Sequence, residues 1–228
     1  QFSLVGASFT GELYTNGQYQ NRLFKDVSVL LTDADFKDVN NWSVSIDDIS
    51  GENKFYNLKH LGIKKIERTP DRLNVDKAFI RIDNSFLDFD AQIGQLYDLG
   101  DILNGQMNLS LRKTKVKLND LFPILPGLEK EFGNEPLAKK YIQIQGDYQI
   151  SKEEVQGKLI KIWLNGKHFF EGNGVFTKTG AYKESLLNFE ITGLKTNLTD
   201  LDAQIDRIKI PEELKRLGEL TFKGNFDG

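Results

Sequence analysis

Cysteine is absent from this chain of 228 residues. Without a thiol the protein forms no disulfide, has no thiolate nucleophile and offers no cysteine ligand to zinc. The chain also lacks any run of the roughly 18 to 20 apolar residues that a membrane-spanning helix needs, and its first residues do not follow the pattern of a signal peptide. If the protein belongs to a cell envelope, we expect its membrane anchor to lie outside this sequence.

A concentration of one charge sign is missing as well. Lys and Arg number 30 against 33 Asp and Glu, so the formal net charge is −3, and both signs are scattered along the chain. Proteins that bind the phosphate backbone of nucleic acids carry a basic patch or stripe. Nucleic acid is therefore not an expected partner.

Catalytic and metal-binding motifs are scarce. The two histidines, His60 and His168, lie in unrelated contexts without HExxH or another ligand spacing, and we interpret both as surface or turn residues. The adjacent carboxylates Asp47 and Asp48 would face opposite sides of a strand, which prevents them from dividing acid and base roles. The sequence predicts no catalytic residue, no cofactor, no metal site and no enzymatic activity.

What the chain does contain is a motif that occurs twice, about eighty positions apart. The first copy, about 116–150, begins VKLNDLFPILPGLEKEF and closes on YIQIQGDYQI; the second, about 197–228, begins NLTDLDAQIDRIKIPEELKRLG and closes on ELTFKGNFDG. Such a repeat predicts an elongated architecture in which each unit buries its apolar face against its neighbours. No low-complexity linker divides the chain, so we expect 1–228 to be one continuous β-rich segment of a longer protein.

Alternation of apolar and polar residues with a period of two dominates the sequence. The clearest run places Leu87, Phe89 and Ile93 on one side and Asp88 and Asp90 on the other. Similar runs lie within 27–31, 42–46, 73–82, 107–111, 142–150, 160–164, 187–191 and 220–226. One apolar face opposite one polar face is typical of antiparallel sheets, so the sequence predicts a mainly β fold, a long antiparallel meander of about a dozen strands.

Turn and helix signals complete this prediction. Turns are expected at Asn16-Gly17, Ser50-Gly51, Asn104-Gly105, Asn165-Gly166, Gly172-Asn173-Gly174 and Thr179-Gly180, because Asn and Gly tolerate positive φ. Pro211 to Leu217 has Pro and two acids at its start and two bases near its end, the charge order of a short helix. Its counterpart, Leu121 to Phe132, is interrupted by two prolines, so we expect one or two short helices in all.

The apolar face has two possible structural roles. Phe is frequent, with 16 residues, and it falls repeatedly on the alternating apolar positions. Such a face could form the closed core of a sandwich, or a long repeating meander could roll into a trough lined with hydrocarbon. The repeat favours the trough.

Three stretches resemble a known family. They are the closing IPEELKRLGELTFKGNFDG, the pattern V-x-L-x-D-L-F-P-x-L-P from Val116 to Pro126, and Phe79 to Leu103, a strand followed by YDLGDI. Together they resemble the TamB and AsmA-like family of translocation and assembly module proteins in double-membraned bacteria. The resemblance extends over most of the chain and is weakest before about Asp26.

This resemblance implies a periplasmic protein that is tethered to the inner membrane by a helix outside the present chain. Members of the family form a folded-over sheet, the β-taco, with a hydrophobic groove. They are thought to carry phospholipid between the inner and outer membranes, to support outer-membrane biogenesis, and to meet an outer-membrane β-barrel partner, here through regions outside this chain. The present chain would be an internal segment of that bridge.

The groove residues follow from alternation, because the family has no catalytic residues to carry over. We expect phospholipid acyl chains to contact the inward apolar positions Leu87, Phe89, Ile93, Met107, Leu109, Leu111, Ile142, Ile144, Tyr148, Ile162, Leu164, Phe189, Ile191 and Phe222. The alternative functions are a structural β-repeat whose apolar face is closed by packing, and a scaffold that chaperones outer-membrane proteins by strand pairing.

Overall fold

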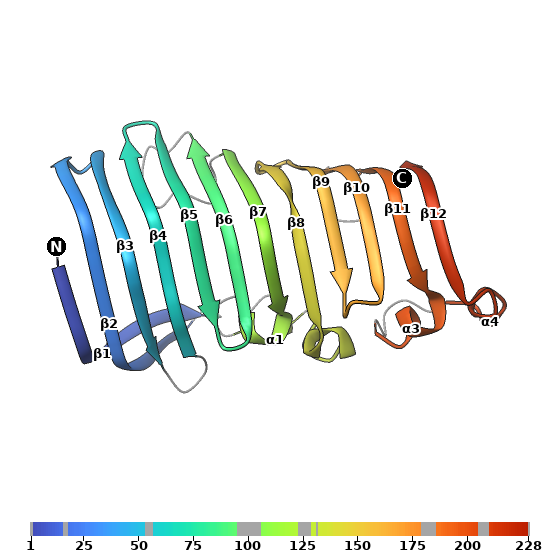
Figure 1. Ribbon diagram of the computed structural model, residues 1–228, viewed down its shortest axis with the longest axis horizontal. Helices are drawn as coiled ribbons and strands as arrows, with labels where there is room; N and C mark the ends of the chain where they lie inside the picture. The colour runs from blue at the N-terminus through green and yellow to red at the C-terminus, as the bar shows by residue number, and fades with distance from the viewer. Residues whose placement is uncertain are drawn as a thin grey trace.

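One sheet contains every strand of the protein that the structure describes. The structure, a computed structural model, describes residues 2–15, 18–52, 57–94, 106–122, 129–130, 132–178, 186–204 and 210–227, with the backbone alone for 9–24. These residues form a 12-stranded antiparallel sheet in which every strand pairs with its neighbours in the sequence. Figure 1 shows the strands side by side in chain order. The predicted antiparallel meander is confirmed.

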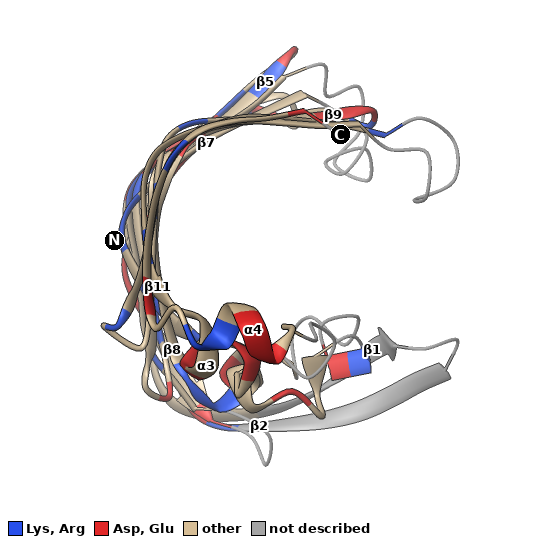
Figure 2. Cartoon of the chain, turned by 90° about the vertical axis from the view of Figure 1, so that its right-hand side faces the viewer, with Lys and Arg blue, Asp and Glu red and all other residues tan. Residues whose placement is uncertain are grey.

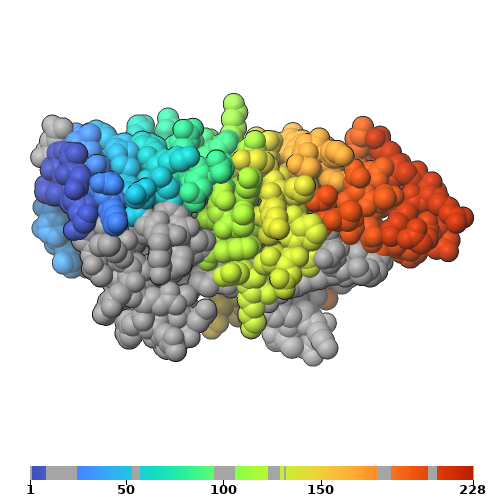
Figure 3. Space-filling view, turned by 90° about the horizontal axis from the view of Figure 1, so that it is seen from below, coloured from blue at the N-terminus to red at the C-terminus, as the bar shows by residue number. Residues whose placement is uncertain are grey.

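The strands are mostly ten to fourteen residues long. Their bounds are β1 Phe2–Thr15, β2 Gln18–Asp38, β3 Asn41–Glu52, β4 Asn57–Thr69, β5 Arg72–Ile82, β6 Ser85–Gly94, β7 Gln106–Lys117, β8 Tyr141–Ile150, β9 Glu154–Leu164, β10 His168–Thr177, β11 Leu186–Asn197 and β12 Glu219–Asp227. Neighbouring strands lie about 4.8 Å apart, so the sheet extends about 50 Å across its strands. In Figure 3 the colours follow one another along the length of the body, which shows that the chain advances steadily in one direction.

The sheet curves strongly. Figure 2 shows a C-shaped cross-section when the sheet is viewed along its length. β-Bulges explain this shape, because an extra residue in one strand bends the strand and increases its twist. Four bulged residues have left-handed backbone angles: Asp26 (φ 50°), Asp33 (φ 49°), Lys77 (φ 52°) and Leu159 (φ 52°).

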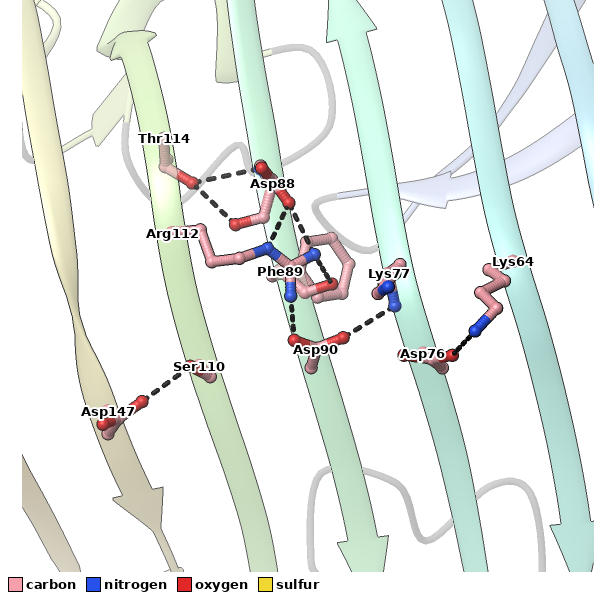
Figure 4. Close-up of polar contacts among 10 residues, drawn as sticks. All are labelled: Lys64, Asp76, Lys77, Asp88, Phe89, Asp90, Ser110, Arg112, Thr114 and Asp147. Carbon is pink, nitrogen blue, oxygen red and sulfur yellow. Dashed lines mark hydrogen bonds and ion pairs between the residues drawn. The ribbon is translucent and has the colours of Figure 1, made fainter.

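Side chains of neighbouring strands satisfy the backbone groups that the bulges release. The Lys77 backbone N–H donates to Oδ1 of Asp90 at 2.7 Å, a bond drawn in Figure 4, and the Leu159 N–H donates to Oδ1 of Asn173 at 2.9 Å. The hydroxyl of Thr114, beside the bulge of β7, accepts from the Asp88 N–H at 3.1 Å. The bulges are therefore stabilised by specific bonds.

Two segments interrupt the meander with short helices. After β7 come α1 (Leu118–Leu121) and the 3-10 helix η2 (Pro136–Lys139); after β11 come α3 (Leu198–Asp202) and α4 (Glu212–Lys215). The two repeated segments therefore share one order of elements. Besides α1, α3, α4 and η2, residues 129, 130 and 132 are also helical, so the described residues hold more helix than expected, and none of these helices is long and apolar enough to cross a membrane.

The helix predictions have mixed outcomes. The helix expected within Pro211 to Leu217 is confirmed as α4. In the other copy, α1 begins at Leu118, before the expected start at Leu121; residues 129, 130 and 132 are helical as expected, and 123–128 and 131 lie outside the described residues.

The turn predictions are also mixed. Asn165-Gly166 forms the turn between β9 and β10. The turns expected at Ser50-Gly51 and Gly172-Asn173-Gly174 are wrong, because these residues lie within β3 and β10. At Gly172 a Cβ would lie 2.2 Å from the carbonyl oxygen of Glu190, so this glycine permits close backbone approach instead of a turn. The other three expected turns lie outside the described residues: Asn16-Gly17, Asn104-Gly105 and Thr179-Gly180.

Candidate functional site

The register assigns each side chain to one face of the sheet, because directly paired residues in antiparallel strands point the same way. Ser85, Leu87 and Phe89 share a face along β6, and the Ser85 hydroxyl donates to Asp120 of α1 at 2.7 Å. The helical pieces therefore cover this face. Figure 2 draws α3 and α4 within the curve of the sheet, so this face is the concave one. We call it the inner face, and the opposite one the outer face.

Every predicted groove residue lies on the inner face. Phe89 is paired with Leu111, Leu109 with Tyr148, and Ile144 with Ile162. The half-buried members of the set are Leu87, Phe89, Met107, Leu109, Leu111, Ile142, Ile144, Tyr148, Ile162, Phe189 and Ile191; Ile93 and Leu164 are buried, and Phe222 is exposed. Among the described residues no second sheet covers this face.

The inner face forms an open trough between β8 and β12. The trough has a volume of about 560 Å³ and is lined by Tyr148, Ile160, Ile162, Phe170, Phe189, Ile191, Phe222, Asn225 and Phe226. No charged side chain is among these residues. The site therefore offers almost continuous hydrocarbon and aromatic contact with very few polar atoms.

One aromatic contact and one neutral phenol characterise the lining of this trough. The rings of Phe170 and Phe189 meet edge to face, with centroids 5.8 Å apart and an interplanar angle of 79°. Burial, with the neighbouring Asp147 carboxylate as the second cause, raises the pKa of the Tyr148 phenol. The phenol is therefore neutral at physiological pH, and the trough carries no charge there.

The outer face is polar and is held together by ion pairs and hydrogen bonds. Arg112 contacts both Asp88 and Asp90 of the neighbouring strand, and Ser110 donates to Asp147 at 2.6 Å (Figure 4). Amide side chains form a further row across the strands, in which Gln92 donates to Asn74 at 3.0 Å and accepts from Asn108 at 3.4 Å. The two faces therefore differ sharply in polarity, as alternation predicted.

At the end of the strands where the helices lie, the inner face is covered and its side chains are buried. Val116 and Leu164 are buried there, and so are the polar residues Ser85 and Thr196. The interpretation of His168 as a surface or turn residue is wrong: it lies in β10, only 7% exposed, and its Nδ1 is 2.7 Å from the Thr196 hydroxyl. Burial lowers the pKa of its imidazole; Asp200 opposes this shift and Lys167 adds to it.

The acidic pair Asp47 and Asp48 also differs from expectation. A bulge in β3 sends both carboxylates to the outer face, where Asp47 accepts from Thr32 at 3.1 Å and Asp48 lies 2.6 Å from Nδ1 of His60. The expected opposite orientation is therefore wrong, yet each carboxylate has its own partner on the sheet. Among the described residues no group of three or more His, Cys, Asp or Glu is placed to hold a metal ion.

Phe170 is a trough residue that alternation did not identify. It follows His168 and Phe169, and two adjacent aromatic residues leave the phase of a strand undecided. The structure turns Phe169 to the outer face, where its ring lies 5.4 Å from that of Trp163, and turns Phe170 inward. Ile160 and Phe226 also line the trough, and both continue alternations present in the sequence.

The open apolar trough on the inner face is the candidate functional site. Searches against protein-family models, curated proteins and solved structures found no match to this chain. The residues that line the trough offer mainly hydrocarbon and aromatic surface.

Proposed function

We propose that this chain is a segment of a periplasmic bridge that carries phospholipid between the inner and outer membranes. The observation that carries the proposal is an apolar inner face that stays half-exposed over many strands. Withdrawing acyl chains from water onto such a face stabilises them by about 0.8 kcal/mol per methylene group. The open side of the groove leaves the charged headgroup in water, where it needs no partner on the protein.

The sequence likeness to TamB and AsmA-like proteins agrees with this proposal. If the chain functions as these proteins do, a helix outside this chain tethers the protein to the inner membrane, and regions outside this chain meet the outer-membrane β-barrel partner. The length also fits a segment, since a sheet about 50 Å long is one part of a bridge between two membranes. No residue of the chain is proposed as catalytic.

Photo-crosslinking tests the proposal by comparing neighbouring residues. A photoreactive amino acid at Phe89, Leu109, Ile144 or Phe189 on the inner face should label phospholipid in cells that carry the full-length protein. The same residue at Asp88, Ser110, Gln143 or Glu190 on the outer face serves as the matched control and should not. Equal labelling from the two faces would show that the groove is not the lipid path.

A second candidate function is a scaffold for outer-membrane proteins. It is favoured by β1 and β12, the first and last strands of the described sheet, each of which has one edge without a partner strand. Exposed backbone N–H and C=O groups at such edges can pair with a strand of another protein. Photo-crosslinkers placed along β12 would then capture protein in preference to phospholipid.

A further inference from the structure

The trough contains a row in which large rings and glycines lie next to one another. Tyr148 of β8 is paired with Gly157 of β9, Gly157 with Gly174 of β10, and Gly174 with Phe189 of β11. All four residues point to the inner face. Two aromatic side chains therefore flank two residues that have no side chain at all.

Neighbouring side chains occupy the space that a side chain on these glycines would need. A Cβ on Gly174 would lie 2.4 Å from Cε1 of Phe189, whereas a Cβ on Gly157 would lie 2.5 Å from Cδ1 of Ile160 and only then 3.3 Å from Cε1 of Tyr148. On β12 the same arrangement recurs within one strand, where a Cβ on Gly224 would lie 2.8 Å from Cζ of Phe222. Each ring therefore lies flat along the wall, as in sheets where an aromatic residue covers a neighbouring glycine.

This arrangement determines how much room the trough has. A ring that leans over a glycine presents its face to the trough, while a ring pushed off the glycine would project into the open volume. The trough of about 560 Å³ is lined by Tyr148, Phe189 and Phe222 and not by the glycines beneath them. The glycines therefore keep the trough open without touching its contents.

The lining favours hydrocarbon over a peptide as the occupant. A peptide brings backbone N–H and C=O groups, each of which costs free energy when buried without a hydrogen-bond partner. Around the trough, the sheet backbone is already paired on both sides from β8 to β11, and Asn225 and Tyr148 are the only lining residues with polar side chains. An acyl chain needs no such partner.

We infer that the inner face between β8 and β12 is a discrete seat for one lipid acyl chain, and that Gly174 is its specificity-determining residue because it lets the ring of Phe189 lie flat. This inference rests on the proposed lipid-carrying function. It adds that the seat is sensitive to a single methyl group placed beneath a ring.

The test is binding of cis-parinaric acid, a fatty acid that fluoresces in apolar surroundings, to the purified chain. Gly174→Ala forces the Phe189 ring into the trough and should weaken binding at least about tenfold, since losing contact with two methylene groups has about that effect. The matched control is Gly193→Ala. Gly193 lies on the outer face of β11, where a Cβ would meet Cε1 of Phe169 at an ordinary 3.5 Å, so binding should be unchanged.

A double variant separates the ring from a general effect on the fold. Phe189→Ala removes the ring, so Gly174→Ala in that background should cause no further loss of affinity. Comparing Phe189→Ala with the double variant still tests the inference if Gly174→Ala alone lowers the melting temperature to the assay temperature. Wild-type affinity in Gly174→Ala, or a further loss in the double variant, overturns the inference.

The proposed function fails in a different way. If the unmodified chain neither binds cis-parinaric acid nor yields labelled phospholipid from any inner-face position, the lipid-carrying function itself is wrong. If the unmodified chain binds the probe and Gly174→Ala binds it equally well, the lipid function stands and only the glycine seat is wrong.

Discussion

The two repeated segments share one order of elements but are stabilised differently. The first unit, β7 to β8, has η2 before its closing strand, and the second unit, β11 to β12, has α4 in that place. Five residues before the matching strand positions Ile142 and Leu220 stand Leu137 and Lys215. Leu137 is buried, and its N–H donates to the carbonyl oxygen of Gln204 in the second unit at 3.0 Å.

Lys215 instead binds through charge. Its Nζ lies 2.7 Å from Asp202 and 2.8 Å from Glu212, and hydrogen bonds to these two carboxylates raise the pKa of the amine. The residue at this position is therefore apolar where another unit covers it and charged where it stays accessible to water. A repeated sequence motif thus specifies the order of elements, while the neighbouring unit decides how each copy is anchored.

The largest effect is expected from removing the apolar anchor. Leu137→Ala should lower the free energy of unfolding by about 2 to 5 kcal/mol, because it removes buried methyl groups and leaves a cavity. Lys215→Ala should cause a smaller loss, which shrinks further at high salt because salt screens an ion pair that is only partly buried. Urea unfolding of both variants at low and high salt measures the difference.

Leu137→Met is the control for this prediction, since it nearly conserves volume and should retain most of the stability. Similar losses in Leu137→Ala and Lys215→Ala would contradict the view that the two units are anchored by different forces.

A smaller contrast is expected at an aspartate that both units use to hold the preceding hairpin. Asp120 accepts from the hydroxyl of Ser85, a fully buried side chain, whereas Asp200 pairs with the exposed Lys167 at 3.2 Å. Asp120→Ala leaves the Ser85 hydroxyl without that acceptor and should cost about 1 to 3 kcal/mol. Asp200→Ala should cost about 0 to 1 kcal/mol, the usual worth of a surface ion pair.

The urea midpoint of each variant tests this second contrast. Asp120→Asn is the control, because its side-chain oxygen can still accept from the Ser85 hydroxyl and it should retain most of the stability. A larger effect at Asp200 than at Asp120 would show that burial does not set the strength of these links.

Alternation predicted the faces of the sheet because a strand has a side-chain period of two wherever its backbone is regular. It placed Leu87, Phe89 and Ile93 correctly on β6, which pairs with β5 over most of its length. Alternation could not predict the curvature of the sheet. A bulge adds a single residue, and in the sequence it only shifts the apolar and polar positions by one. Leu159 is such a residue, 68% exposed beside the buried Ile160.

Two other features depend on contacts that one strand does not reveal. The sequence Gly172-Asn173-Gly174 looks like a turn, and only the neighbouring strand shows that Gly174 makes room for Phe189. His168 looks like a surface residue because its own strand does not show that helical pieces cover that end of the inner face. Long-range packing decided both outcomes, and local sequence pattern carries little information about it.

The smallest predicted effect is a dependence of stability on pH. It arises at one buried position where the two units carry different residues. Thr196 of the second unit holds His168, whereas the matching residue of the first unit is the apolar Val116. Burial lowers the pKa of His168 in the folded state, despite the opposing charge of Asp200 and with a contribution from Lys167. At a pH below the ordinary histidine value of about 6.5, the unfolded chain binds a proton that the folded chain does not, so stability falls.

The stability from this residue is therefore present above about pH 6.5 and declines as the pH falls toward the lowered pKa, by at most about 1.4 kcal/mol per pH unit for one proton. His168→Gln cannot titrate and can still bond to Thr196, so its urea midpoint should decline less than that of the wild type between pH 7.5 and 5.5. Parallel declines in the wild type and His168→Gln would mean that the acid sensitivity arises elsewhere in the sheet.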